Sequence, residues 1–187
     1  MTAFGITTPG EMLAKLIEEQ RDFIDGHCLS ARHAINAVMT AYHLHEWVWG
    51  GFVKQRHDLH KVWQLSLGRK AEKRDFLRWL MKKQQCPALM EAEKVTDGTK
   101  HFNISNISTG SHRGAFQTNA FQHNAFDVSY LWIERNGQRQ RALYFIEELV
   151  DFWSAFFAKY DVALKPRPRT SIGHTELGTR IGFWLRP

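Results

Sequence analysis

The residues best suited to chemistry lie in two short segments that are far apart in the sequence. His43 and Glu46 are three residues apart, so on a helix they share a face and could act as a general base with an orienting carboxylate, or as paired metal ligands. Lys100 and His101 follow Asp97 and would add a cation for an anionic group and a second imidazole. The sequence therefore predicts a catalytic set of four residues, with Asp97 as an alternative carboxylate: His43, Glu46, Lys100 and His101.

A polar stripe on the helix that carries His43 supplies candidate ligand-binding residues. At 100° per residue, Arg32, Asn36 and Trp47 fall on the same side of that helix as His43. They could offer a cation, an amide and an aromatic surface to one pocket. The alternative is structural: Asn36 and His43 would tie the helix to the chain after Lys100, and Trp47 would only pack.

The sequence identifies no metal and no cofactor. There are ten histidines, but no HExxH motif, no second ExxH and no cysteine ligand pair. A small metal-dependent enzyme that uses His43, Glu46 and His101 is nevertheless one alternative for the function.

The charge pattern favours an anionic partner, which makes binding of RNA or DNA the leading hypothesis. The formal net charge is +6, and basic residues surround Trp79 on one expected helix. Arg135, Arg139 and Arg141 flank an expected hairpin tip. The alternative interpretation is a solvated helix face and a charged sheet edge. The candidate nucleic-acid-binding residues are Lys70, Lys73, Arg74, Arg78 and Lys82.

A metal-independent ribonuclease is a further alternative. Ribonucleases of the HEPN group are all-helical and carry an Arg that is followed after four to six residues by a His. Arg21 and His27 match this spacing, as do Arg167 and Arg169 with His174. Gly26 disfavours a helix across the first match.

The pattern of elements predicts an α+β fold that is mainly α, with a bundle-like N-terminal two-thirds. Thr8 and Glu11 form a capping box for a helix that reaches Gly26, and Ser30 caps a mostly apolar helix that Gly50-Gly51 ends. Asn136-Gly137 predicts a type I′ hairpin within 126–145, in a small antiparallel sheet. Segregated helices and strands disfavour a doubly wound fold. The other expected elements are helices at 55–67, 70–83, 87–95 and 147–160, and a strand at 101–107.

Residues 1–164 are expected to form a single domain, followed by a basic and partly extended tail at 165–187. Three Ala-Phe units between Ala115 and Phe126 could cover a sheet face or display aromatic rings, and Phe183-Trp184 could dock on the domain or on a second copy. A homo-oligomer is therefore possible. A non-catalytic assembly or interaction protein is the last alternative for the function.

Composition indicates a cytoplasmic protein. There are only two cysteines, no signal-peptide pattern at the start and no run of 18 apolar residues, so we expect no disulfide framework and no membrane partner.

Several of these motifs together resemble short bacterial proteins that carry no assigned activity. The resemblance covers most of the first 160 residues and is carried by HLHEW at 43–47, KHF at 100–102, the Ala-Phe-Gln repeat and the closing hairpin. It implies a bacterial source. It also indicates where a functional site is to be sought first, namely on the face formed by Asn36, His43, Glu46, Trp47, Lys100 and His101.

Overall fold

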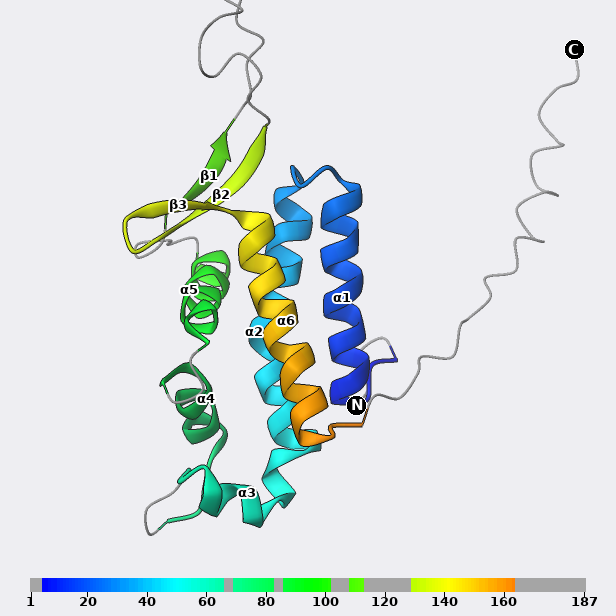
Figure 1. Cartoon of the computed structure of the whole chain (residues 1–187), viewed down its shortest axis with the longest axis vertical. Helices are drawn as coiled ribbons and strands as arrows, with labels where there is room; N and C mark the ends of the chain where they lie inside the picture. Colours follow the sequence, from blue (N-terminus) through cyan, green and yellow to red (C-terminus); the bar gives the residue numbers. More distant parts are fainter. Residues whose placement is uncertain (1–4, 66–68, 83–85, 102–107, 113–128, 164–187) are drawn as a thin grey trace, which may run out of the picture.

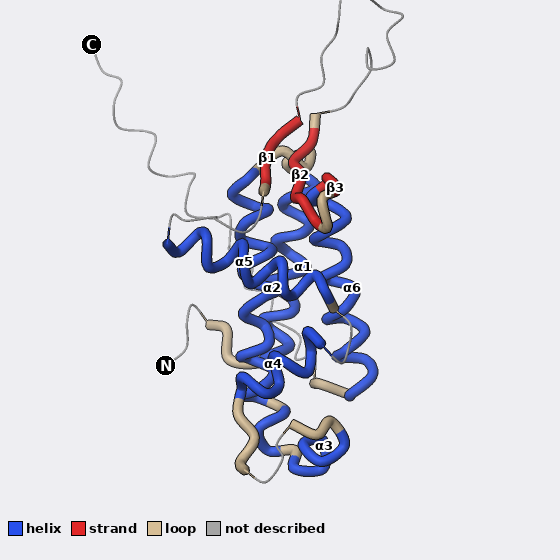
Figure 2. Tube along the Cα trace, turned by 90° about the vertical axis from the view of Figure 1, so that its left-hand side faces the viewer, coloured by secondary structure: helices blue, strands red, loops and turns tan. Residues whose placement is uncertain are grey.

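The computed structural model describes residues 5–65, 69–82, 86–101, 108–112 and 129–163, and of residues 100 and 101 it describes the backbone only. Three long helices, α1, α2 and α6, lie side by side (Figure 1), and the shorter helices α4 and α5 line one side of α2 below a small sheet (Figure 2). The expected mainly α, α+β fold is confirmed. The elements are α1 (Pro9–Asp25), α2 (Ala31–Gly51), η1 (Val53–Gln55), α3 (His57–Val62), α4 (Lys73–Lys82), α5 (Pro87–His101), β1 (Thr109–His112), β2 (Tyr130–Arg135), β3 (Gln138–Arg141) and α6 (Ala142–Tyr160).

Helix α1 begins at the predicted capping box. The Thr8 hydroxyl accepts a hydrogen bond from the Glu11 amide, and the Glu11 carboxylate accepts one from the Thr8 amide at 3.0 Å. These bonds satisfy two backbone donors that would otherwise have no partner in the first turn. The helix ends at Asp25, and His27 follows with a positive φ of 56°. Arg21 and His27 therefore do not share a helix, contrary to the geometry of the HEPN pattern.

Helix α2 is central, as its apolar composition predicted, because it packs against α1, α4, α5 and α6. Its predicted end was wrong by two residues, since Gly50 and Gly51 belong to the helix. A Cβ on Gly51 would lie 2.7 Å from the Pro9 ring. Gly51 thus permits close approach of α1 to α2 rather than ending the helix.

The segment after α2 forms shorter helices than predicted. Where one helix was expected over 55–67, the chain forms η1 and the six-residue α3, and α4 begins at Lys73 rather than at residue 70. Helix α4 buries Phe76, Trp79 and Leu80. Its exposed residues include Lys73, Arg74, Arg78 and Lys82.

Helix α5 corrects two expectations about Asp97-Gly98. The helix was expected to stop there, but it continues to His101, so Lys100 and His101 lie in its last turn and not in a turn after it. The hydroxyls of Thr96 and Thr99 donate to the carbonyls four residues earlier, at 2.8 and 2.7 Å. Gly98 is buried, and packing of α5 against α2 outweighs the weak helix propensity of glycine. The strand expected at 101–107 is wrong at His101, and its other residues lie outside the described ranges.

The sheet has the order β1-β2-β3 with both pairs antiparallel. Asn136 and Gly137 both have positive φ, at 52° and 74°, which is what the predicted type I′ turn requires. Pairing of Trp132 with Gly110 and with Arg141 fixes the register across all three strands. Residues 130, 132 and 134 therefore face outward, while 131, 133 and 135 face the helices.

Helix α6 begins at Ala142, five residues earlier than predicted. Leu143 and Phe145 were expected on the second hairpin strand, but they lie in the first turns of α6, where Phe145 is buried. The helical period of the apolar residues from Phe145 to Phe157 outweighs the short local alternation. Trp153 is fully buried, and its indole N–H donates to the Ala41 carbonyl at 2.9 Å, which joins α6 to α2.

Some expectations fall on residues outside the described ranges. These are the Ala-Phe repeat and the whole basic tail at 165–187, which includes the aromatic Phe183-Trp184. No helix among the described residues combines the length and the apolar character that crossing a bilayer requires.

Candidate functional site

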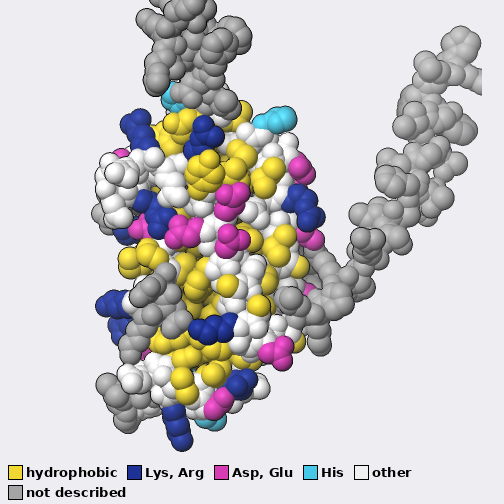
Figure 3. All heavy atoms as spheres, viewed as in Figure 1, with side chains coloured by type: hydrophobic (Ala, Val, Ile, Leu, Met, Phe, Trp, Pro, Cys, Tyr) yellow, Lys and Arg dark blue, Asp and Glu magenta, His cyan; other side chains and the backbone are white. Residues whose placement is uncertain are grey.

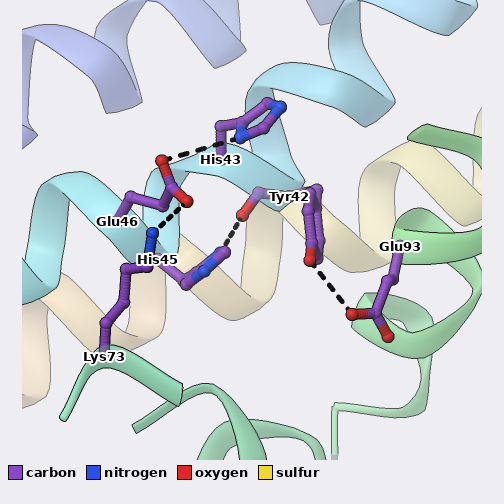
Figure 4. Close-up of polar contacts among 6 residues, drawn as sticks. All are labelled: Tyr42, His43, His45, Glu46, Lys73 and Glu93. Atoms are coloured by element: carbon purple, nitrogen blue, oxygen red, sulfur yellow. Dashed lines mark hydrogen bonds and ion pairs between the residues drawn. The ribbon is translucent and has the colours of Figure 1, made fainter. Parts of the chain in front are cut away.

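The predicted catalytic residues His43 and Glu46 belong to a polar seam where α2 meets α4 and α5 (Figure 4). Nδ1 of His43 lies 3.9 Å from Oε2 of Glu46, and Oε1 of Glu46 accepts a hydrogen bond from Nζ of Lys73 at 2.5 Å. The Tyr42 hydroxyl donates to the Glu93 carboxylate at 3.1 Å. A chain of polar contacts therefore runs from α4 across α2, and a second one joins α2 to α5.

The seam brings together residues for which the sequence predicted two different roles. Glu46 was expected to be catalytic and Lys73 to bind nucleic acid, yet they form an ion pair. Burial raises the pKa of Glu46, but the hydrogen bond and charge of Lys73, with the nearby His45 and His43, hold that pKa below its ordinary value. Glu46 is thus ionised at neutral pH, with one carboxylate oxygen bonded to Lys73 and the other facing His43.

His45 was not among the predicted site residues, and it is the buried residue of the seam. Its Nδ1 donates to the Tyr42 carbonyl at 2.5 Å, and only 2% of the residue is exposed. Because a carbonyl can only accept, Nδ1 carries the proton in the neutral ring. Burial lowers the pKa of His45, and the bond to Tyr42 only partly opposes this effect. His45 is therefore a neutral structural imidazole at physiological pH.

Tyr42 shows that carboxylates gather on this side of α2. Burial raises the pKa of its hydroxyl, and the charges of Glu93, Asp97 and Glu46 raise it further. Asp97 thus lies near the seam, on the exposed side of α5. Lys100 and His101 lie one turn further along α5.

The three expected ligand-binding residues do not share one pocket. Arg32 is exposed at the start of α2, where its guanidinium contacts the His33 ring at 2.8 Å, and Asn36 is exposed. Trp47 packs against the hydrophobic core. At about 1.5 Å per residue, Arg32 and Trp47 are about 22 Å apart along α2. In the described part of the chain, no group of three or more His, Cys, Asp or Glu is arranged to hold a metal ion.

The predicted basic helix does present a row of cations. Arg74, Arg78 and Lys82 are exposed and four residues apart on α4, so they line one face. No described carboxylate lies within ion-pair distance of any of the three. Lys70 is exposed just before the helix. Figure 3 shows Lys and Arg side chains, with some carboxylates between them, along the margin that carries the hairpin, α5 and α4.

The outer face of the sheet is the second basic surface, and here arginine and aromatic side chains alternate. The Arg139 guanidinium lies 4.3 Å from the ring centroid of Trp132, and that of Arg141 lies 4.8 Å from the centroid of Tyr130. The His112 ring stacks on Tyr130 at 5.0 Å. This stacking platform consists of His112, Tyr130, Trp132, Arg139 and Arg141.

The three arginines at the hairpin have two different environments. Arg135 faces the helices, where its guanidinium contacts Glu148 at 2.5 Å and Glu91 at 3.6 Å. Arg139 and Arg141 face outward, and within the described residues neither forms an ion pair. The difference between Arg135 and the other two arginines could have been predicted from the sequence. The register of a two-residue turn places Arg141 opposite Trp132, and Arg139 on the same face of the sheet as both.

Comparison with protein-family models, with curated proteins and with solved structures gave no match for this chain. The function proposed below therefore rests on the described residues.

Proposed function

We propose that this protein binds single-stranded nucleic acid on the stacking platform. The observation that carries the proposal is the pair of guanidinium groups held over the Trp132 and Tyr130 rings. Proteins that bind single strands without sequence preference combine aromatic stacking surfaces with cations that follow the phosphates. The platform places both on one face of three paired strands.

The packing around the platform supports this role. A Cβ on Gly110 would lie 2.6 Å from the Trp132 ring, so glycine lets that indole lie across β1. A guanidinium held over a ring keeps its edge N–H groups available for phosphate, while its plane can stack with a base. An open surface hollow beside the platform includes Tyr130, Arg139 and Arg141 in its lining, together with residues of the hairpin turn and Tyr144.

The cation row on α4 supports the same partner. Figures 1 and 2 place α4 on the side of the molecule that carries the hairpin, with α5 between them. Exposed and unpaired cations release condensed counterions when they meet phosphates, which gives affinity without reading the sequence. Arg74, Arg78 and Lys82 would thus extend the contact beyond the platform.

The proposal predicts a preference for single strands that depends on salt. In fluorescence anisotropy, a labelled oligothymidine or oligouridine should bind more tightly than a duplex of the same length. The logarithm of the affinity should fall linearly with the logarithm of salt concentration, with a slope of about −0.7 per neutralised phosphate. Trp132→Leu should weaken single-strand binding by about tenfold, since stacking contributes about 1–3 kcal/mol per base.

Matched variants separate the platform from general charge and from packing. Trp47→Leu removes an indole that packs on the core, and Arg56→Gln removes an exposed cation that pairs with Asp58, so both should leave affinity unchanged. Tyr130→Leu is the second platform variant if Trp132→Leu does not fold. Absence of salt-dependent binding, or equal affinity for strand and duplex that neither platform variant alters, would overturn the proposal.

A further inference from the structure

A pocket of about 310 Å³ lies between the inner face of the sheet and helices α2, α5 and α6. Its walls are mostly hydrocarbon, from Ile35 and Val38 on α2, Val95 on α5, Leu131 on β2, and Phe145 on α6. Among the residues that the structure describes, no charged side chain lines it. The pocket is partly open to solvent, because Ala31, Thr109 and Ser111 in its lining are exposed.

Water that fills the pocket would meet a mostly hydrocarbon surface. Three hydroxyls line it, from Thr99, Thr109 and Ser111, and a buried water needs two to four polar partners. The Thr99 hydroxyl already donates to the Val95 carbonyl at 2.7 Å, so it offers only a lone pair. An apolar molecule that displaced this water would remove hydrocarbon surface from contact with water, which is favourable.

The space exists because small residues stand where larger ones would close it. Ala31 and Ala34 line the pocket on α2, and Ala142 lines it at the start of α6. An apolar cavity of about 150 Å³ is enough to bind benzene. The space here is about twice as large and so matches a bicyclic ring system.

We propose that this pocket is a binding site for a small uncharged molecule with an apolar body of about two fused rings. A hydroxyl or N–H on the ligand would donate to the Thr99 hydroxyl oxygen. A charged group would lose part of its hydration here and would have no ion-pair partner among the described lining residues. This site shares Trp132 with the stacking platform, whose other residues lie on the opposite face of the sheet.

The test uses the full chain and three probes: naphthalene, 2-naphthol and 2-naphthoate. Methyl NMR should show shifts confined to pocket methyls such as those of Ile35, Val38 and Leu131, with naphthalene and 2-naphthol but not with the charged 2-naphthoate. Ala34→Phe should fill the space and weaken 2-naphthol by at least about tenfold. Ala158→Phe, at an exposed position near the other end of α6, should bind like the unmodified protein.

A second variant keeps the test informative if Ala34→Phe does not fold. Thr99→Val removes the acceptor, so it should weaken 2-naphthol while leaving naphthalene unchanged. No shift of pocket methyls with either neutral probe would overturn the proposal, whether the space is collapsed in solution or filled by the chain itself. Equal binding of 2-naphthoate, or full binding by both variants, would also overturn it.

Discussion

At the scale of single residues, the polar seam shows how burial decides which side chains can do chemistry. His43 and Glu46 share a helix face, as their spacing predicted. The Glu46 carboxylate, however, accepts a hydrogen bond from Lys73 of α4. His45 lies between His43 and Glu46 in sequence and points into the protein, where it is neutral. The imidazole of His45 is thus fixed by the Tyr42 carbonyl and closed to solvent.

His45 should make stability depend on pH in a defined window. Its pKa in the folded protein lies below the ordinary value of 6.5, so the unfolded chain takes up a proton first as the pH falls. The stability that the neutral ring contributes is present above pH 6.5 and is lost as pH falls through the folded pKa. His45→Asn keeps a donor for the Tyr42 carbonyl without titrating.

Urea unfolding of both proteins from pH 8 to pH 5 measures this effect. The free energy of unfolding of the unmodified protein should fall below pH 6.5 more steeply than that of His45→Asn, by at most about 1.4 kcal/mol per pH unit for one group. Parallel curves would show that His45 titrates normally. A variant of an exposed histidine, His57→Asn, serves as the control.

At the scale of elements, Arg135 joins three of them. It lies on β2 and contacts Glu91 on α5 and Glu148 on α6, while its guanidinium also lies 5.5 Å from the Phe145 ring centroid. The side chains of Arg135 and Glu91 are only 14% and 12% exposed. Oε2 of Glu91 is buried, and the described residues offer it no hydrogen bond. The ion pair with Arg135 therefore compensates a buried charge.

Arg135→Met should destabilise the protein by about 3 kcal/mol, because removing one partner leaves a buried carboxylate unpaired. Arg139→Met on the outer face of the same hairpin should cost under about 1 kcal/mol, since it removes one exposed cation–π contact. Adding Glu91→Gln to Arg135→Met should recover part of the loss. Equal destabilisation by Arg135→Met and Arg139→Met, measured by urea unfolding, would show that the Glu91 pair contributes nothing.

At the scale of the whole molecule, buried residues from every α-helix except α3 and from β2 form one hydrophobic cluster. Trp153 ties α6 to α2, and Trp63, Phe76 and Trp79 stack beside them. Cys86 belongs to this cluster and is 2% exposed, whereas Cys28 is half-buried in the turn between α1 and α2. The two thiols thus report on different parts of the fold.

Thiol labelling should separate local from global opening. Burial raises the pKa of Cys86 to about 12, while burial and the charge of Glu147 raise that of Cys28 less far. With an aromatic disulfide at pH 8, Cys28 should react first, and Cys86 should react only at the rate that unfolding permits. Cys28→Ser and Cys86→Ser isolate each thiol. If Cys86 reacts as fast as Cys28, or if urea does not accelerate its labelling, the cluster opens locally around it.

Local interactions in the sequence were enough to predict several features. The bonds between Thr8 and Glu11 and the positive φ at Asn136 and Gly137 depend on neighbours within a few residues, so the sequence alone determined where α1 begins and how the hairpin turns. The same holds for the mainly helical class and for α2 as the central helix, because its apolar composition must be buried on most sides.

Only the tertiary structure decided the features that depend on distant partners. Local propensity predicts that Gly51 and Gly98 end their helices, but Gly51 lies in α2, which packs on α1, and Gly98 lies in α5, which packs on α2. Glu46 and Lys73 are 27 positions apart, and nothing local pairs them. The pairing of Arg135 with Glu91 and Glu148, and the pocket beneath β2, follow from how the sheet packs on the helices. Such contacts are set by the packing of whole elements, which local propensity and periodicity do not encode.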